Sequence, residues 1–432
     1  MMATNRRRYS RPAVDDHVDH ALEVELDVTN VAHGGVFVAR YDGRVVFVAD
    51  TLPGERVLAR VSDTRHASFW RAETLRVLQA APERREHVWR EASVDRTPTE
   101  RAGGAEFGHI TDEHQRELKR RVLVDALQRF GGISTDAVVE EIGGEATGWR
   151  TRVRLQVSRD GVVGPYAARS HHVVAVDSLP LASDAAAAIA PLGERHPHAV
   201  SIDVVAPSDD APRLLVAERD GRGRASTAAG SHAVVHERVG DRRFAVDAGG
   251  FWQVHRSAAT TLTSAVQDAV DEDLFDARAA NLDLYGGVGL LAAAIGDRFG
   301  SATRVTSVES DERATEHAGA NLAEWLGATA ITARVDRYLA ELVGTASASD
   351  RRRLEAATVV LDPPRSGAGR AVIDSLAELA PRQLVYVACD PVALARDTGL
   401  LRGHGYELTG LRAFDLFPNT HHLEAVASFT RR

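Results

Sequence analysis

The chain has 432 residues, 44% of them hydrophobic and 26% charged, which is enough apolar material for two or three globular domains and excludes a disordered protein. No apolar run reaches the roughly 18 residues that span a bilayer, and the arginine-rich residues 1–11 have no apolar segment behind them, so we expect neither a membrane anchor nor a secretion signal. A single cysteine excludes an intrachain disulfide and, together with a formal net charge of -9, indicates a cytoplasmic protein without an overall basic surface.

Residues 21–80 have the pattern of a small β-barrel. Short runs with alternating apolar residues lie at 22–28, 35–41, 44–50, 55–61 and through Phe69 and Trp70. Between them, Gly34-Gly35, Asp42-Gly43 and Pro53-Gly54 supply the backbone angles that tight turns require. Five strands in so short a segment predict a barrel of the oligonucleotide-binding type. Its aromatic side chains either stack on nucleic-acid bases or fill the barrel core, and they are Phe37, Tyr41, Phe69 and Trp70.

The central segment, residues 81–250, starts with a polar stretch at 82–101 and continues with a predicted helix at 112–130. Asp112 can cap the start of this helix and Gly131-Gly132 its end. One face of the helix is apolar, formed by Leu118, Val122, Ala126 and Leu127. Further β-rich runs at 151–158, 171–177 and 213–218 predict an antiparallel or mixed sheet.

After residue 251, strands alternate with helices. This alternation is typical of an α/β fold with a doubly wound, Rossmann-like sheet, which binds its ligand at the carboxyl ends of the strands. The predicted strands are residues 280–286, 303–310, 357–364, 383–390 and 424–429.

A glycine-rich turn follows the first of these strands, at Gly286, Gly287 and Gly289. These glycines allow the backbone to approach a ligand closely, and the start of the next helix favours an electronegative group. Glu309 ends the next strand, where a carboxylate can accept hydrogen bonds from both hydroxyls of a ribose. A surface glutamate without a ligand is the alternative, and the pair is equally compatible with a dinucleotide cofactor.

Two further strands end in residues that can carry chemistry. Pro363 and Pro364 force the chain out of the sheet and leave Asp362 facing the crevice. Cys389, the only thiol, ends the next strand, and Pro391 suits the first turn of a helix. The helix dipole favours a thiolate at Cys389, while the adjacent Asp390 opposes it. An inert packing cysteine is the alternative, but the position at the ligand-binding edge favours a nucleophile.

The last strand begins with a candidate base. Glu424 follows His421 and His422 directly before an apolar run, and we select Glu424 as the group that removes a proton, with the two histidines as further candidates. A salt-bridged surface glutamate is the alternative.

Together these residues resemble the bacterial RNA uracil-C5 methyltransferase family, whose members methylate transfer RNA or large-subunit ribosomal RNA. The resemblance covers nearly the whole chain: GRVVFVADTLPGERVLARV looks like a TRAM domain, HQRELKRRVLVDAL and WRTRVRLQV look like the central domain, and the catalytic motifs follow in family order. It implies a flexible basic N-terminus (1–20), a TRAM barrel that binds RNA (21–80), a central α+β domain (81–250) and a methyltransferase domain (251–432). It also implies that S-adenosylmethionine binds at Gln253, Tyr285, Gly287, Glu309 and Asp362, with Cys389 as nucleophile and Glu424 as base.

The family's reaction explains a thiol at this position. Carbon 5 of uracil is a poor nucleophile, but addition of a thiolate to carbon 6 produces an enolate whose carbon 5 attacks an activated methyl group. A base must then remove the carbon-5 proton so that the thiol can leave.

The sequence departs from the family pattern at three places. Gly286 stands where many members have cysteine or alanine, and Asp390 where many have asparagine. Ala102-Gly103-Gly104-Ala105 replaces a segment in which many relatives have two cysteines that bind an iron–sulfur cluster. Alanine cannot bind iron, so we predict no cluster, no metal and a central domain held by packing.

Two other functions are compatible with parts of the sequence. A non-catalytic RNA-binding protein would leave Cys389, Asp362 and Glu424 unexplained. An oxidoreductase that uses a nicotinamide cofactor would account for the glycine turn but not for Asp362-Pro-Pro or the cysteine. We therefore expect a monomeric enzyme whose partner is transfer or ribosomal RNA and which has no membrane contact.

Overall fold

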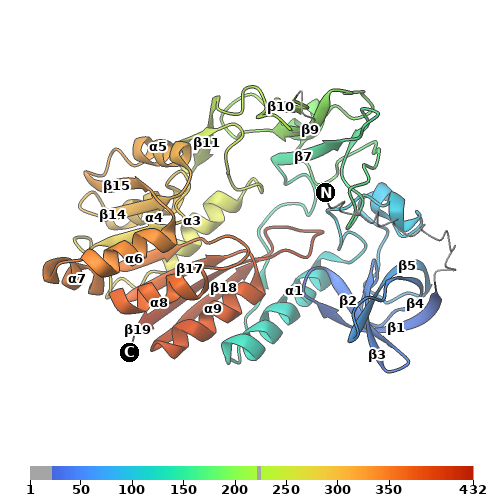
Figure 1. The fold of residues 1–432 in the computed structure, drawn as a ribbon, viewed down its shortest axis with the longest axis horizontal. Helices are drawn as coiled ribbons and strands as arrows, with labels where there is room; N and C mark the ends of the chain where they lie inside the picture. Colours follow the sequence, from blue (N-terminus) through green and yellow to red (C-terminus); the bar gives the residue numbers. More distant parts are fainter. Residues whose placement is uncertain (1–21, 221–224, 432) are drawn as a thin grey trace, which may run out of the picture.

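The computed structural model describes residues 22–220 and 225–431, and Figure 1 shows the N-terminal barrel, the β-rich middle part and the large C-terminal sheet with its helices side by side. The predicted flexible segment 1–20 lies outside the described residues. Within the described part of the chain, no helix combines the length and the apolar character needed to cross a membrane.

The N-terminal strands form a closed barrel in the order β1-β2-β3-β5-β4, as the turn spacing predicts. In β1 alternate residues point inward, so that Val24, Leu26 and Val28 are buried. Phe37 is also core, whereas Trp70 is partly exposed and lies 4.5 Å from the guanidinium of Arg44. The strands are β1 (Glu23–Ala32), β2 (Val36–Tyr41), β3 (Arg44–Ala49), β4 (Arg56–Asp63) and β5 (Phe69–Gln79).

The helix expected at 112–130 is present as α1 (Asp112–Ala126), which passes into a π-helical turn, η3 (Leu127–Gly131). Gly132 ends it with a left-handed φ of 64°, as predicted. The assignment of Asp112 as the cap is wrong. Thr111 is the N-cap residue, and the Asp112 carboxylate accepts a hydrogen bond from Arg85 instead. Two short 3₁₀ turns precede the helix, η1 (Arg90–Ala92) and η2 (Pro98–Glu100).

The β-rich middle part contains a four-stranded antiparallel sheet, order β10-β9-β7-β8, and a two-stranded ribbon, β11-β12. The strand predicted at 171–177 is wrong: this segment makes only an isolated bridge between Val173 and Tyr166. Its apolar residues Val174 and Val176 pack into the core without a strand partner. The elements are β7 (Arg152–Val157), β8 (Val163–Gly164), α2 (Asp184–Ile189), β9 (Ala199–Val205), β10 (Arg213–Glu218), β11 (Val234–Val239) and β12 (Arg242–Asp247).

The C-terminal part is the predicted doubly wound sheet, an eight-stranded sheet in the order β15-β14-β13-β16-β17-β19-β18-β6. The five predicted strands are β13 (Asn281–Leu284), β14 (Arg304–Glu309), β16 (Thr358–Leu361), β17 (Gln383–Ala388) and β19 (Glu424–Arg431). Three more strands join it, β15 (Gly327–Thr332), β18 (Tyr406–Phe414) and β6 (Val139–Glu140). The last of these comes from the central segment.

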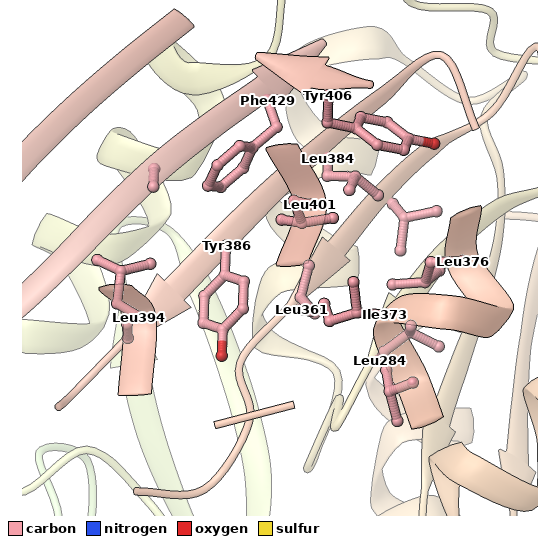
Figure 2. Close-up of a cluster of buried hydrophobic side chains, with 14 of the residues drawn as sticks. Leu284, Leu361, Ile373, Leu376, Leu384, Tyr386, Leu394, Leu401, Tyr406 and Phe429 are labelled. Carbon is pink, nitrogen blue, oxygen red and sulfur yellow. The ribbon is translucent and has the colours of Figure 1, made fainter. Parts of the chain in front are cut away.

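Helices cover both faces of this sheet because successive strand residues point to opposite sides. Leu361 and Tyr386 pack with α8 and α9 on one face (Figure 2), whereas Val360 and Val385 pack with α3 and α4 on the other. The helices are α3 (Ala258–Ala269), α4 (Leu290–Phe299), α5 (Glu312–Asn321), α6 (Val335–Thr345), α7 (Ala348–Glu355), α8 (Gly369–Leu379) and α9 (Pro391–Gly403).

Candidate active site

A cavity of about 1410 Å³ lies at the carboxyl ends of the parallel strands. The loop after β12, the turn after β13, the end of β14 and the loops after β16 and β17 all contribute to its wall. All seven residues that the sequence singled out for binding or catalysis line it, namely Gln253, Tyr285, Gly287, Glu309, Asp362, Cys389 and Glu424. The fold therefore brings them together from segments spread over 172 positions of the chain.

The glycine turn between β13 and α4 is tightly packed. Gly287 adopts a left-handed φ of 54°, which is easy only for glycine. A Cβ atom on Gly286 would collide with the Ser307 hydroxyl and the Asp283 carboxylate. The turn thus presents bare backbone to the cavity.

Glu309 fixes this turn from the neighbouring strand. Its Oε2 accepts a hydrogen bond from Gly287 N–H at 3.2 Å, and its Oε1 accepts one from Asp311 N–H at 2.8 Å. Oε1 also accepts bonds from the N–H and hydroxyl groups of Ser310. Oε2 has only the bond from Gly287, so one of its two lone pairs can still accept a bond from a ligand hydroxyl.

Three carboxyl groups lie at this end of the sheet, with Asp283 and Glu424 buried and Asp362 partly buried. Burial and the neighbouring Asp283 raise the pKa of Asp362 to about 7. Burial and Asp362 raise the pKa of Glu424 well above its usual value, and Glu424 is only 4% exposed. Asp283 is likewise raised to a pKa of about 7 by burial. Because burial and neighbouring charges of one sign disfavour ionisation, all three acids keep their protons to a higher pH than exposed carboxyl groups do.

Cys389 follows β17 and precedes α9, as predicted, and Asp390 caps that helix by accepting hydrogen bonds from Val392 N–H (3.0 Å) and Ala393 N–H (2.8 Å). Of the two opposing effects expected from the sequence, the helix dipole does not prevail in the resting protein, and Asp390 is among the groups that raise the pKa of the thiol. Burial first, and then Glu424 and Asp362, raise the pKa of Cys389 to about 12, because these effects outweigh the helix dipole.

Arg365 is the cationic side chain with the largest effect on the pKa values of Cys389 and Glu424. Its charge lowers the pKa of both Cys389 and Glu424. Its Nη2 lies 3.1 Å from His422 Nε2. Burial is the main cause that lowers the pKa of His422 to about 3. A neutral His422 contacting a guanidinium is poorly suited to the role of base that we left open for it.

A second, smaller cavity of about 110 Å³ adjoins Cys389 on the side of the barrel. The β1–β2 turn reaches it, and His33 Nε2 lies 2.8 Å from the Asp390 carboxylate. Lys119 also lines this small cavity, and its Nζ donates a hydrogen bond to the Asp415 carboxylate at 2.5 Å. Nothing in the sequence pattern marks His33 or Lys119, because their partners lie 357 and 296 positions away.

Comparison with known proteins gives concordant matches. A family model described as tRNA (Uracil-5-)-methyltransferase matches residues 263–432. An uncharacterized RNA methyltransferase of Streptomyces avermitilis is 36% identical over 94% of this chain and 97% of its own. The 23S rRNA (uracil(1939)-C(5))-methyltransferase RlmD of Alkalilimnicola ehrlichii is 31% identical over 94% and 96%, respectively. The crystal structure of Pyrococcus abyssi tRNA (uracil-54, C5)-methyltransferase in complex with S-adenosyl-L-homocysteine shares the fold, with a TM-score of 0.69, 20% identity and coverage of 94% of this chain and 99% of that one.

Proposed function

This chain belongs to the family of RNA uracil-C5 methyltransferases, and we propose on that premise that Cys389 forms a covalent bond to the uridine that is methylated. The enzyme transfers a methyl group from S-adenosylmethionine to carbon 5 of a uridine in RNA. One observation carries the covalent route: the lone thiol, Asp362 and Glu424 line the same cavity as the glycine turn.

The wall near the glycine turn fits the methyl donor. The bare backbone at Gly286 and Gly287 and the carboxylate of Glu309 suit an adenosyl group. The cavity exceeds the roughly 300–1,000 Å³ of a common small-molecule pocket, so it has room for the donor and a flipped nucleotide. When bound, S-adenosylmethionine supplies an electrophilic methyl group. We expect it to be held by Gln253, Tyr285, Gly287, Glu309 and Asp362.

The protein's own groups then account for each bond change. Cys389 gives its Sγ proton to solvent water, Sγ bonds to carbon 6, and the electron pair of the 5,6 double bond forms an enolate. Carbon 5 then takes the methyl group while the bond between that methyl group and the donor's sulfur breaks, which leaves S-adenosylhomocysteine. The Glu424 carboxylate removes the carbon-5 proton. The electron pair of that C–H bond restores the double bond and expels Sγ as a thiolate.

Arg365 supplies the positive charge that this route requires. Both Cys389 and Glu424 must ionise, although burial raises the pKa of each. The Arg365 guanidinium lowers both pKa values, and it lies on the loop that starts with Asp362-Pro-Pro. We infer that it favours the ionised forms once water has left the site.

The substrate is an RNA, and we propose that it is a structured transfer or ribosomal RNA, as for the named relatives. The target uridine must leave its base stack to reach Sγ. We further propose a monomeric, cytoplasmic enzyme in which the barrel contributes to RNA binding.

The decisive experiment replaces Cys389 with alanine. RNA from cells that lack this gene is incubated with S-adenosylmethionine and protein, and 5-methyluridine is measured by mass spectrometry. The wild-type protein should form the product, and Cys389→Ala should form none while still binding S-adenosylhomocysteine. Methylation by the alanine variant would show that the covalent route is wrong.

A further inference from the structure

Five arginines line the large cavity within the described residues, and they differ in what neutralises their charge. Arg313 is paired with Asp247, and Arg334 with Asp336. The other three have no carboxylate oxygen within 4.0 Å among residues 22–220 and 225–431, and they are Arg150, Arg365 and Arg370.

Arg150 is the most constrained of these three. Its N–H donates to Leu181 O at 2.8 Å, and its carbonyl accepts from Ser183 N–H at 2.8 Å, so its backbone is fixed. Its Nε donates to a carbonyl, Arg152 O, at 3.0 Å. Burial lowers the pKa of Arg150, which means that the guanidinium is partly withdrawn from water without a counter-charge.

Arg365 brings a second positive charge to the wall of the same large cavity. The two guanidinium groups interact unfavourably, since Arg365 lowers the pKa of Arg150. Glu106 is the acid that raises the pKa of Arg150. Its carboxylate, however, lies 3.4 Å from His421 Nδ1 and is not within ion-pair distance of Arg150. An anion between the two arginines would remove this repulsion and accept their free N–H groups.

Two anions can enter this cavity, the carboxylate of the methyl donor and a phosphate of the RNA. Arg365 lines both the small cavity beside Cys389 and the large cavity, and its Nη2 lies 3.1 Å from His422 Nε2. It therefore lies on the Cys389 side of the large cavity, which Arg150 lines as well. We propose that Arg150 and Arg365 bind a backbone phosphate next to the target uridine, with Arg370 further along the cavity wall in the first turn of α8. The identity of this anion as RNA rests on the proposed function.

The test is the salt dependence of RNA binding without a methyl donor. The affinity for an oligouridylate is measured by fluorescence anisotropy over a series of KCl concentrations. Arg150→Gln should weaken binding about tenfold at low salt and make the slope of log K against log salt shallower by about 0.7, the loss of one single-strand phosphate contact. Arg365→Gln, an exposed position that should not impair folding, should make the slope shallower by a similar amount.

Two control variants separate a phosphate site from a general charge effect. Arg150→Lys keeps the charge and should keep the slope. Arg298→Gln removes one positive charge from α4, outside both cavities, where Arg298 is paired with Glu272; it should bind like the wild type.

The affinity for S-adenosylhomocysteine, measured by calorimetry, distinguishes the two anions. It should be unchanged in Arg150→Gln. An unchanged salt slope in both glutamine variants, or a loss of S-adenosylhomocysteine binding with full RNA affinity, would overturn the proposal. A wild-type protein that binds the oligouridylate with the steeper slope but methylates no RNA would refute the proposed function and still support the phosphate site.

Discussion

Cys389 shows how strongly surroundings control a single side chain. It occupies the start of α9, where a thiolate is usually favoured, yet burial and two carboxyl groups raise its pKa to about 12. The thiol is therefore protonated in the resting protein, and its reactivity depends on substrate binding. A protonated thiol is oxidised and alkylated more slowly than a thiolate.

This protonation predicts slow alkylation. In the absence of RNA, the rate of modification of Cys389 by iodoacetamide should rise about tenfold per pH unit up to pH 11, because only the thiolate reacts. Mass spectrometry of the intact protein measures the rate, and the denatured protein, whose thiol has an ordinary pKa of about 8.5, is the control. A plateau below pH 9 in the folded protein would contradict the raised pKa.

Glu424 gives a second prediction at the residue scale. Glu424→Gln should lower turnover by a factor of about 100 to 10,000, the usual contribution of a general base. Because the carbon-5 proton then remains, Sγ cannot leave, and a methylated protein–RNA adduct should accumulate as a slow band on a denaturing gel. The double variant with Cys389→Ala should show no such band. If a folded Glu424→Gln protein formed no adduct, Glu424 would not be the base that removes the carbon-5 proton.

The loop after β16 depends on an anchor in α9. The buried Asp397 carboxylate accepts hydrogen bonds from Tyr386 Oη–H at 2.7 Å and from the N–H groups of Ala368 (2.7 Å) and Gly369 (3.2 Å). This network joins β17, α9 and the loop that carries Asp362 and Arg365. Ala368 and Gly369 line the large cavity, whereas Asp397 and Tyr386 hold them in place from behind the wall.

Loss of this anchor should destabilise the protein. Asp397→Ala leaves the Tyr386 hydroxyl and Gly369 N–H without an acceptor, whereas Ala368 N–H can still donate to Tyr386 Oη at 3.1 Å. Each unpaired buried group costs about 1–3 kcal/mol, so the free energy of unfolding in urea should fall by roughly 2 kcal/mol or more. Tyr386→Phe removes the bond to Asp397 and the one from Ala368 N–H, but Ala368 and Gly369 keep Asp397 as their acceptor, so it should cost only about 1 kcal/mol. Equal effects of the two substitutions would show that the loop does not depend on Asp397.

At the level of elements, the sequence predicted strands best where both faces are buried. Every residue of β13, β16 and β17 is buried, and β16 and β17 are mainly apolar. It missed β15 and β18, in which many residues are partly exposed and the apolar pattern is weak. It wrongly assigned a strand to 171–177, because apolar residues such as Val174 bury themselves equally well in irregular backbone.

At the scale of the whole molecule, the barrel is tied to the catalytic sheet by polar contacts. The β1–β2 turn contacts Asp390 through His33, and α1 contacts the loop after β18 through Lys119 and Asp415. A small strand of the central segment, β6, pairs with β18. The division into segments 21–80, 81–250 and 251–432 stays a prediction, and these contacts link all three.

The partly buried side chain of His87 predicts how the stability of the folded protein changes at low pH. His87 packs under Gly108, its Nδ1 accepts from Trp89 N–H at 2.9 Å, and burial lowers its pKa from 6.5 to about 4. The folded protein binds the proton less well than the unfolded chain, so the stabilisation is complete above pH 6.5 and is lost as the pH falls toward 4. The contribution of this group is roughly 3 kcal/mol.

Urea unfolding of His87→Gln between pH 4 and 7.5 tests this effect. The variant should be less stable than the wild type at pH 7.5, and its stability should decline less steeply toward pH 4. His66→Gln, at an exposed position, should follow the wild-type profile. A parallel decline in His87→Gln and the wild type would contradict the assignment.

The sequence by itself determined the order of elements and the residues that meet in the cavity. It could do so because the carboxyl ends of parallel strands share one edge of the sheet, so Glu309, Asp362 and Cys389 had to converge there. Only the tertiary structure decided the charges in that cavity. The protonation of Cys389, the unpaired Arg150 and the contact of His33 with Asp390 depend on burial and on side chains from distant segments. These electrostatic effects depend on distances that exist only once the chain has folded.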